Sequence, residues 1–297
     1  MDLFRGKKKI VDYKCKISNL SGFSDEIIED LKLAFPESYN ESKMMAEISK
    51  RIKTDSKSQV CILPFCHTVE AEAFGGLINL SDGKFGPRAA SYVYQSIEEM
   101  LALPNIDFQQ GRVNEVLKAC KILHDQGEKV VLMVSGFLTI VNSLIDLTKV
   151  FKAWRNDGEK VDKIFLHISD NLYQFFVEAK KAGVSIISYA DPIGSMSIIG
   201  PAHAEKMTVD FTIPLLKRGE SLADEHLIFH ICPKISLLLF RMGLVESKIV
   251  QFSKGISYEE ACINTLGKEK IIGQNCLCNP TCTELPHGKI RAMHLIP

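Results

Sequence analysis

The chain has 297 residues, with 36 basic and 36 acidic side chains and a formal net charge of zero. This balance gives no electrostatic reason to expect a nucleic acid or an anionic membrane as partner. The longest apolar runs, near residues 130–134 and 235–240, are also too short to span a bilayer. The length suits one large core, because barrel proteins commonly form a single domain of this size.

Nine cysteines occur in this chain without a recognisable signal peptide. In a chain of this length, that pattern predicts a reducing compartment rather than a disulfide framework. We therefore expect a cytoplasmic protein whose cysteines serve as core residues, metal ligands or nucleophiles.

The first 58 residues are predicted to be helical and polar, with amphipathic stretches at 25–35 and 41–52. They precede the first apolar run that reads as a strand. We interpret residues 1–58 as a helical N-terminal extension that covers one end of the fold.

From residue 60 onward, short apolar runs alternate with helical patterns. Eight runs are predicted as strands, at 60–65, 77–80, 130–134, 184–189, 227–232, 248–252, 270–273 and 289–295. Helix signals lie between most of them; Ser257, for example, begins a capping box before a helix expected to end at Gly267. Buried strands separated by helices predict an α/β fold, here a (β/α)8 TIM barrel that makes residues 1–297 one domain.

The last predicted strand is not followed by a helix pattern. Its flank would therefore need another cover. The N-terminal helices are one candidate, and a partner subunit, as in a homodimer, is the other.

In such a barrel, the residues that follow each strand meet at one face. His67 and Glu70 follow the first strand, where Glu70 can act as an acid or base, hold a basic substrate group or orient a metal-bound histidine. Alternatively, Glu70 is an ordinary carboxylate in the first turn of a helix, where a negative charge is favourable. Ser135 follows the third strand, and Tyr189 and Asp191 stand at the end of the fourth, where Asp191 can also serve as a helix cap.

His230 and Cys232 end the fifth predicted strand and share one face, because side chains on a strand repeat every two residues. An imidazole and a thiolate aimed at one point suit zinc. Cys276, directly after the seventh strand, would supply a third ligand and leave the fourth position open. Cys278 faces the same way and remains the alternative, whereas Cys282 lies further along the loop; any single cysteine can also be a plain core residue.

Taken together, six segments resemble the uroporphyrinogen decarboxylase superfamily over roughly residues 60–280. They are HTVEAEAFGG, GP before SIEE, SGFLT, YADPIGSMSIIGP, HIC and IIGQNC. The similarity is strongest to the branch of methylcobalamin:coenzyme M methyltransferases and related corrinoid-dependent methyltransferases. That resemblance implies a barrel that binds zinc and moves a methyl group between a corrinoid, either methylcobalamin or a corrinoid protein, and a thiol such as coenzyme M. Tetrahydrofolate is the other acceptor that it implies.

The resemblance places the zinc pair on His230 and Cys232. In the family the third cysteine normally follows the last strand, about one strand–helix unit after Cys276, and Gly often stands where this chain has Pro233. On this interpretation Glu70 and Asp191 position the substrate or tune the metal. His67, Ser135 and Tyr189 are then expected to contact the substrate.

Two other functions are compatible with the resemblance. A decarboxylase of porphyrin biosynthesis needs an early arginine-rich motif for its many carboxylates, but the N-terminal third offers only Arg5, Arg51 and Arg88. A barrel that binds a corrinoid without turnover is the second alternative. Methyl transfer from methylcobalamin separates it from the enzymes.

Overall fold

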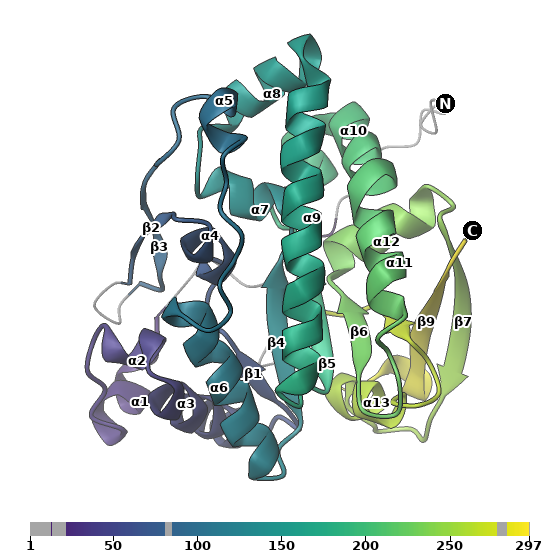
Figure 1. Cartoon of the computed structure of the whole chain (residues 1–297). Coiled ribbons are helices and arrows are strands. Elements are labelled where there is room, and N and C mark those ends of the chain that lie inside the picture. The colour runs from purple at the N-terminus through teal and green to yellow at the C-terminus, as the bar shows by residue number, and fades with distance from the viewer. Residues whose placement is uncertain (1–12, 14–21, 81–84, 278–283, 297) are drawn as a thin grey trace.

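The computed structural model describes residue 13 and residues 22–80, 85–277 and 284–296. Its centre is a seven-stranded sheet with the order β1-β4-β5-β6-β8-β9-β7, beside a separate hairpin of β2 and β3 (Figure 1). The strands are β1 Cys61–Leu63, β2 Leu77–Asn79, β3 Arg88–Ser91, β4 Val130–Ser135, β5 Ile186–Ala190, β6 Ile228–Ile231, β7 Val245–Gln251, β8 Ile271–Ile272 and β9 Lys289–Leu295.

Five strands, β1, β4, β5, β6 and β8, form a parallel sheet. Their sequences are almost continuously apolar, and all five residues of β5 are buried. A strand reads this way when both faces of its sheet are covered. The predicted α/β fold is thereby confirmed, with a mostly parallel central sheet.

Helices supply most of the cover of this sheet. They are α1 Asp25–Asp30, α2 Glu37–Asn40, α3 Ser42–Asp55, α4 Val69–Ala73, α5 Ile97–Met100, α6 Gly111–Asp125, α7 Phe137–Asn142, α8 Leu147–Asn156, α9 Gly158–Lys181, α10 Met196–Met207, α11 Ile213–Glu220, α12 Pro233–Arg241 and α13 Tyr258–Asn264. Two short turns complete the list, a π turn at Thr208–Thr212 and a 3₁₀ turn at Pro286–Gly288. The long helix α9 lies between α6 and α11 across one face of the sheet (Figure 1).

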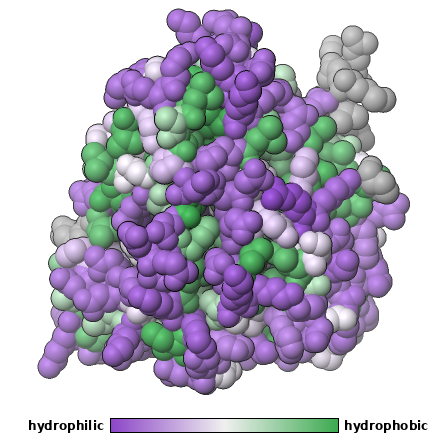
Figure 2. Space-filling view, viewed as in Figure 1, coloured by the Kyte–Doolittle hydropathy of each residue, from purple (hydrophilic) through white to green (hydrophobic). Residues whose placement is uncertain are grey.

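The outer surface of this helix layer is largely hydrophilic, with scattered hydrophobic side chains (Figure 2). Such scattering is normal for a solvent-facing surface. Among the helices that the structure describes, none is both long and apolar enough to cross a membrane.

Two hydrophobic clusters pack on opposite faces of the sheet. Leu132 and Phe229 belong to the larger cluster, which also contains the buried faces of α6 and α9. Val131 and Ile186, which alternate with neighbours in the first cluster, belong to the smaller one together with Tyr258 of α13. The second face also borders the cavity described below.

The N-terminal helices precede β1 as predicted, and α3 packs against both β1 and α6. The hydroxyl of Ser49 in α3 donates a hydrogen bond of 3.1 Å to the backbone oxygen of Ile62 in β1. A helix that packs along an edge strand in this way provides hydrogen-bond partners for the backbone groups of the strand and shields them from other chains.

The second predicted strand is placed differently from the prediction. The run at 77–80 forms β2, which pairs with β3 in a hairpin and not with the central sheet. Leu77 is 57% exposed, and the run is too short and too mixed to be buried on both faces. Within the described residues the sheet order begins at β1 and ends at β7, and no strand pairing that would close a barrel is detected between them.

The last strand also differs from its prediction. β9 runs antiparallel between β8 and β7, so β7 does not pair with β6. Parallel neighbours need a long crossover, usually a helix, whereas the described part of the β8–β9 connection contains only the short turn at Pro286–Gly288. The flank of β9 is consequently covered by two strands and not by the N-terminal helices.

Candidate active site at the carboxyl ends of the strands

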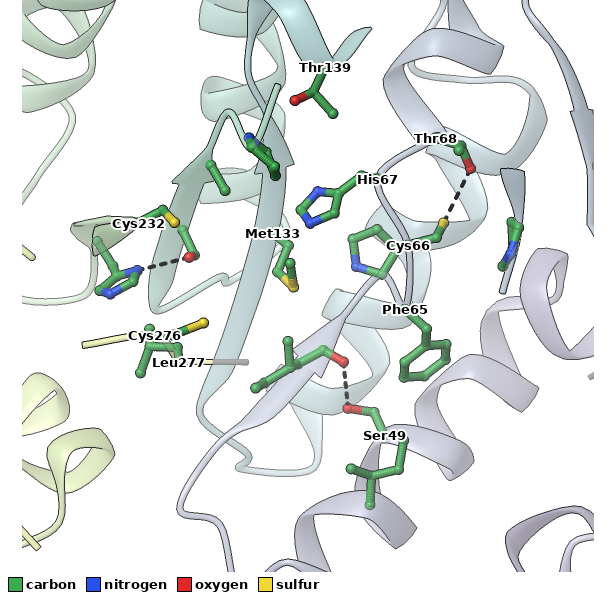
Figure 3. A pocket seen from close by; sticks show the side chains of 18 of the residues that line it. Ser49, Phe65, Cys66, His67, Thr68, Met133, Thr139, Cys232, Cys276 and Leu277 are labelled. Atoms are coloured by element: carbon green, nitrogen blue, oxygen red, sulfur yellow. Dashed lines mark hydrogen bonds between the residues drawn. The ribbon is translucent and has the colours of Figure 1, made fainter. Parts of the chain in front are cut away.

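A cavity of about 690 Å³ lies against the face of the sheet that is turned away from α6 and α9 (Figure 3). Four of the five parallel strands contribute side chains to its wall, namely Ile62 of β1, Met133 of β4, Ser188 and Ala190 of β5 and His230 of β6. A volume of this size is within the usual range for small-molecule sites, roughly 300–1,000 Å³. The cavity is therefore the candidate active site.

His230 is buried, and both of its ring nitrogens have hydrogen-bond partners. Nδ1 lies 2.8 Å from the hydroxyl oxygen of Ser188, and Nε2 lies 2.9 Å from the backbone oxygen of Asn275. Because a carbonyl can only accept, Nε2 carries the proton, and Nδ1 accepts from the Ser188 hydroxyl. Burial lowers the pKa of His230 to about 4, so the imidazole is neutral near pH 7.

Cys232 and Cys276 line the same cavity. Cys232 directly follows β6 and begins α12, whose first residue is Pro233. Cys276 follows β8, the neighbour of β6 in the sheet. Figure 3 shows the two cysteines on one side of the cavity, across from Cys66. Cys278 and Cys282 lie outside the described residues.

The donor set fits zinc in kind, because zinc takes imidazole nitrogen and thiolate sulfur. The geometry is not that of a formed site: within the residues described here, no three His, Cys, Asp or Glu side chains gather closely enough to enclose a metal ion. One of the two hydrogen bonds of His230 would have to be exchanged for the metal. The zinc site therefore stays a prediction.

Three residues predicted at the first and third strand ends come together as a group. The backbone N–H of Ser135 donates to Glu70 Oε1 at 2.7 Å, and the Ser135 hydroxyl lies 3.4 Å from Nδ1 of His67. His67 lines the cavity, and burial lowers its pKa to about 4. The group thus presents a neutral imidazole to the cavity, with Ser135 and Glu70 behind it.

Glu70 does not itself line the cavity. It is 1% exposed, and burial raises the pKa of its carboxyl group. Its second oxygen, Oε2, has no hydrogen-bond partner among the described residues. Glu70 is linked to the cavity through Ser135 and the side chain of His67.

Asp191 also lies behind the cavity wall. Its oxygens accept from the backbone N–H groups of Leu138, Thr139 and Gly194 at 3.0, 2.9 and 3.1 Å, and from the Thr139 hydroxyl at 2.7 Å. The helix-capping alternative is therefore the contact observed, although Asp191 caps α7 and not the helix that follows it. Tyr189 is buried beside it, and burial raises the pKa of its phenol well above 10.

One buried group near the site could not be predicted from the sequence. The guanidinium of Arg112 in α6 bonds to Glu72 at 2.5 Å, to the Cys66 sulfur at 3.2 Å and to the Thr68 hydroxyl at 2.8 Å. These contacts hold the segment after β1 that carries His67. Because the partners are about 40 residues apart in sequence, no local pattern reveals them.

Comparisons with known proteins agree with this architecture. The sequence model of a family described as "Uroporphyrinogen decarboxylase (URO-D)" matches residues 25–276. A curated relative, "Methylcobamide:CoM methyltransferase MtaA" of Methanosarcina barkeri, is 25% identical over 252 residues, which are 84% of this chain and 71% of the relative. "Methylcobamide:CoM methyltransferase MtbA" of Methanosarcina acetivorans is 27% identical over 207 residues, 67% of this chain and 59% of the relative.

A solved structure titled "methyltransferase from Methanosarcina mazei" has the same fold. It superposes with a TM-score of 0.62 over 76% of this chain and 67% of that chain, at 21% sequence identity. A likeness at this identity bears on the fold, and the site must be argued from its own residues.

Proposed function

The chain belongs to the uroporphyrinogen decarboxylase family, and from this premise we propose that it is a corrinoid-dependent methyltransferase. It would move a methyl group between a corrinoid and a thiol held in the cavity beside His230 and Cys232. The observation that carries the proposal is that an imidazole and two thiols, from the ends of the neighbouring strands β6 and β8, line one cavity. The methyltransferase activities of the two relatives named above support it.

We assign His230, Cys232 and Cys276 as the zinc ligands. A bound zinc ion would deprotonate the acceptor thiol, which is otherwise mostly protonated at neutral pH. Burial keeps the imidazole of His230 neutral, so a lone pair is available to a metal without loss of a proton. The metal would take the Nδ1 lone pair that now accepts from Ser188, and the Asn275 carbonyl, which accepts from the other ring N–H, would orient the ring as partners of metal-bound histidines usually do.

The other residues of the cavity wall supply apolar surface and polar groups. Val60, Ile62 and Leu277 supply apolar surface that limits water around the reacting sulfur. Thr139 and His67 are polar groups on the same wall and can orient a substrate. The cavity is larger than a small thiol requires, which leaves space for the methyl-carrying face of the donor.

The arrangement of the arginines argues against a porphyrinogen carboxylate substrate. Arg51 is bound to Asp30 and Asp55 on the surface of α3, and Arg112 is bound to Glu72 and its neighbours. Among the described arginines only Arg88 lines the cavity. A substrate with many carboxylates would meet too few guanidinium groups there.

The decisive experiment is a methyl-transfer assay with free methylcobalamin, followed by the change in cobalamin absorption, and a zinc analysis of the purified protein. We expect about one zinc per chain and demethylation of the corrinoid that depends on an added thiol such as coenzyme M. Methyl transfer to tetrahydrofolate, and not to a thiol, would identify tetrahydrofolate as the acceptor. Decarboxylation of uroporphyrinogen, or corrinoid binding without turnover, would overturn the proposal.

A further inference from the structure

Two cationic side chains line the cavity to which Cys232 also contributes. Lys234 lies two residues after Cys232, in the first turn of α12, and Arg88 reaches the wall from β3. Neither makes an ion pair with any residue that the structure describes; the recorded partner of Arg88 is the ring of Phe85, 5.5 Å from the guanidinium carbon. These positive charges are therefore available to a ligand.

The other titratable groups of the wall do not cancel this charge. Lys53 is paired with Glu128. Glu259 is occupied by the Ser58 hydroxyl and the Gln59 N–H, both at 2.8 Å, beside the start of β1. Burial lowers the pKa of the wall residue His67 to about 4, so this imidazole is neutral at pH 7.

The nearby carboxyl groups also point elsewhere. Glu70 and Asp191 lie behind the wall, and the oxygens of Asp191 accept hydrogen bonds from α7 and from Gly194. The positive end of the α12 dipole adds to the charge of Lys234. The cavity wall beside Cys232 is thus electropositive, which favours an anion there.

We propose that Lys234, assisted by Arg88, binds an anionic group on the acceptor thiol and so sets its specificity for sulfonate or carboxylate thiols. The identity of the acceptor rests on the proposed methyl transfer, but the anion subsite does not. Pro233 lies between Cys232 and Lys234 at the start of the helix and restricts the backbone there. The binding positions for the thiol end and for the anionic end of the acceptor are thereby held in a fixed relation to each other.

The subsite can be tested on metal-free protein without any methyl transfer. Iodoacetate and iodoacetamide both alkylate a cysteine by forming a carbon–sulfur bond with loss of iodide, and they differ in charge. We expect Lys234→Met to lower the iodoacetate-to-iodoacetamide rate ratio at Cys232 by about three- to a hundredfold, the range for two unit charges about 6 Å apart at effective dielectric constants between those of water and a protein surface. Peptide mass spectrometry assigns the modified cysteine.

Matched variants make this result specific. Lys234→Arg keeps the charge and should keep most of the ratio, and Arg88→Met should lower it less than Lys234→Met. Lys53→Met removes a cavity lysine that is already paired with Glu128, so the ratio should stay near that of the parent protein. An unchanged ratio in Lys234→Met, or an equal fall in Lys53→Met, would overturn the proposal.

Acceptor selectivity tests the same residue in the reaction. With methylcobalamin as donor, 2-mercaptoethanesulfonate, 3-mercaptopropionate and 2-mercaptoethanol separate sulfonate, carboxylate and neutral thiols. Lys234→Met should reduce the preference for the anionic thiols over the neutral one by about tenfold, mainly through KM. If the parent protein methylates none of the three, the proposed function fails, and the alkylation ratio still decides whether the anion subsite exists.

Discussion

At the scale of single residues, His230 shows how burial and hydrogen bonding together prepare a side chain. Desolvation removes its proton near neutral pH, and Ser188 and the Asn275 carbonyl fix one tautomer. The neutral ring can exchange one hydrogen bond for a metal, whereas an imidazolium would first have to lose a proton.

The first prediction concerns Cys232, one of the proposed zinc ligands. Cys232→Ser should lose most of the bound zinc, because a serine hydroxyl is a poor zinc ligand. The fold should persist, since the core lies in the two hydrophobic clusters and Cys232 belongs to neither. Metal analysis and thermal unfolding measure both effects. Cys120→Ala, a change on α6 away from the cavity, should keep zinc; full zinc occupancy in Cys232→Ser would refute the assignment.

The second prediction uses the buried carboxyl group of Glu70. Burial raises its pKa above the ordinary value of 4.5, so the folded protein binds a proton there more tightly than the unfolded chain. This contribution to stability is complete below pH 4.5 and is lost as the pH rises through the raised folded pKa. Glu70→Gln, which imitates the protonated group, should lack that loss. Unfolding free energies measured across this pH range check it; parallel curves for the two proteins would contradict it.

How well single residues could be predicted depended on whether their role is local. Strand alternation correctly placed His230 and the thiol of Cys232 on one cavity wall, because the period of two is a property of the backbone. Asp191 and Tyr189 were expected at the cavity, but they lie behind its wall. The Asp191 carboxylate accepts hydrogen bonds from α7, about 50 residues earlier, and no local pattern in the sequence indicates such contacts.

At the scale of elements, the start of a helix could be predicted where the residue that caps it lies in the same segment of the sequence. Ser257 caps α13 through a hydrogen bond of 3.1 Å from the Glu260 N–H, as the capping box predicted. The helix α7 has no such local cap: Gly136 stands at its N-cap position, and the cap comes from Asp191. A side chain at Gly136 would lie 2.4 Å from Cβ of Asp191, so glycine permits this close approach.

The third prediction tests this distant cap. Asp191→Asn replaces one acceptor oxygen by an NH₂ group that cannot accept from the α7 backbone. Because the site is buried, the unpaired N–H should cost about 1–3 kcal/mol of unfolding free energy. Urea denaturation measures the change. Asp146→Asn is the matched control: Asp146 caps α8 through Thr148 near the surface, where water can replace the lost acceptor, so its cost should be smaller. Equal costs would contradict the argument.

At the scale of the whole molecule, the sequence predicted the α/β class but not the arrangement of the sheet edges. Alternating strands and helices follow from local patterns, whereas strand order depends on contacts between distant segments. The run at 77–80 looked like a barrel strand and forms a hairpin, and the strand β9 inserts between β8 and β7. Both differences arise from short or mixed strands, for which local sequence does not specify a neighbour.

Because the described sheet keeps an edge at β1, other contacts must join the start of β1 to the later part of the chain. Glu259 of α13, which is 4% exposed, makes such a contact. It accepts from the Ser58 hydroxyl and the Gln59 N–H just before β1, across 200 residues of sequence. A buried carboxylate with two donors stabilises such a junction only while the donors remain in place.

The fourth prediction is that this junction is a cooperative part of the whole fold. Glu259→Ala should cost about 1–3 kcal/mol of unfolding free energy, because it leaves buried donors unpaired. Ser58→Ala should cost less alone, and the double variant should show a coupling energy of about 0.5 kcal/mol or more, as expected for side chains in contact. Glu260→Ala, at the exposed neighbouring position, serves as control and should change stability little. Denaturant unfolding gives all four values, and strictly additive costs for Glu259→Ala and Ser58→Ala would show that α13 and β1 are held together by other contacts.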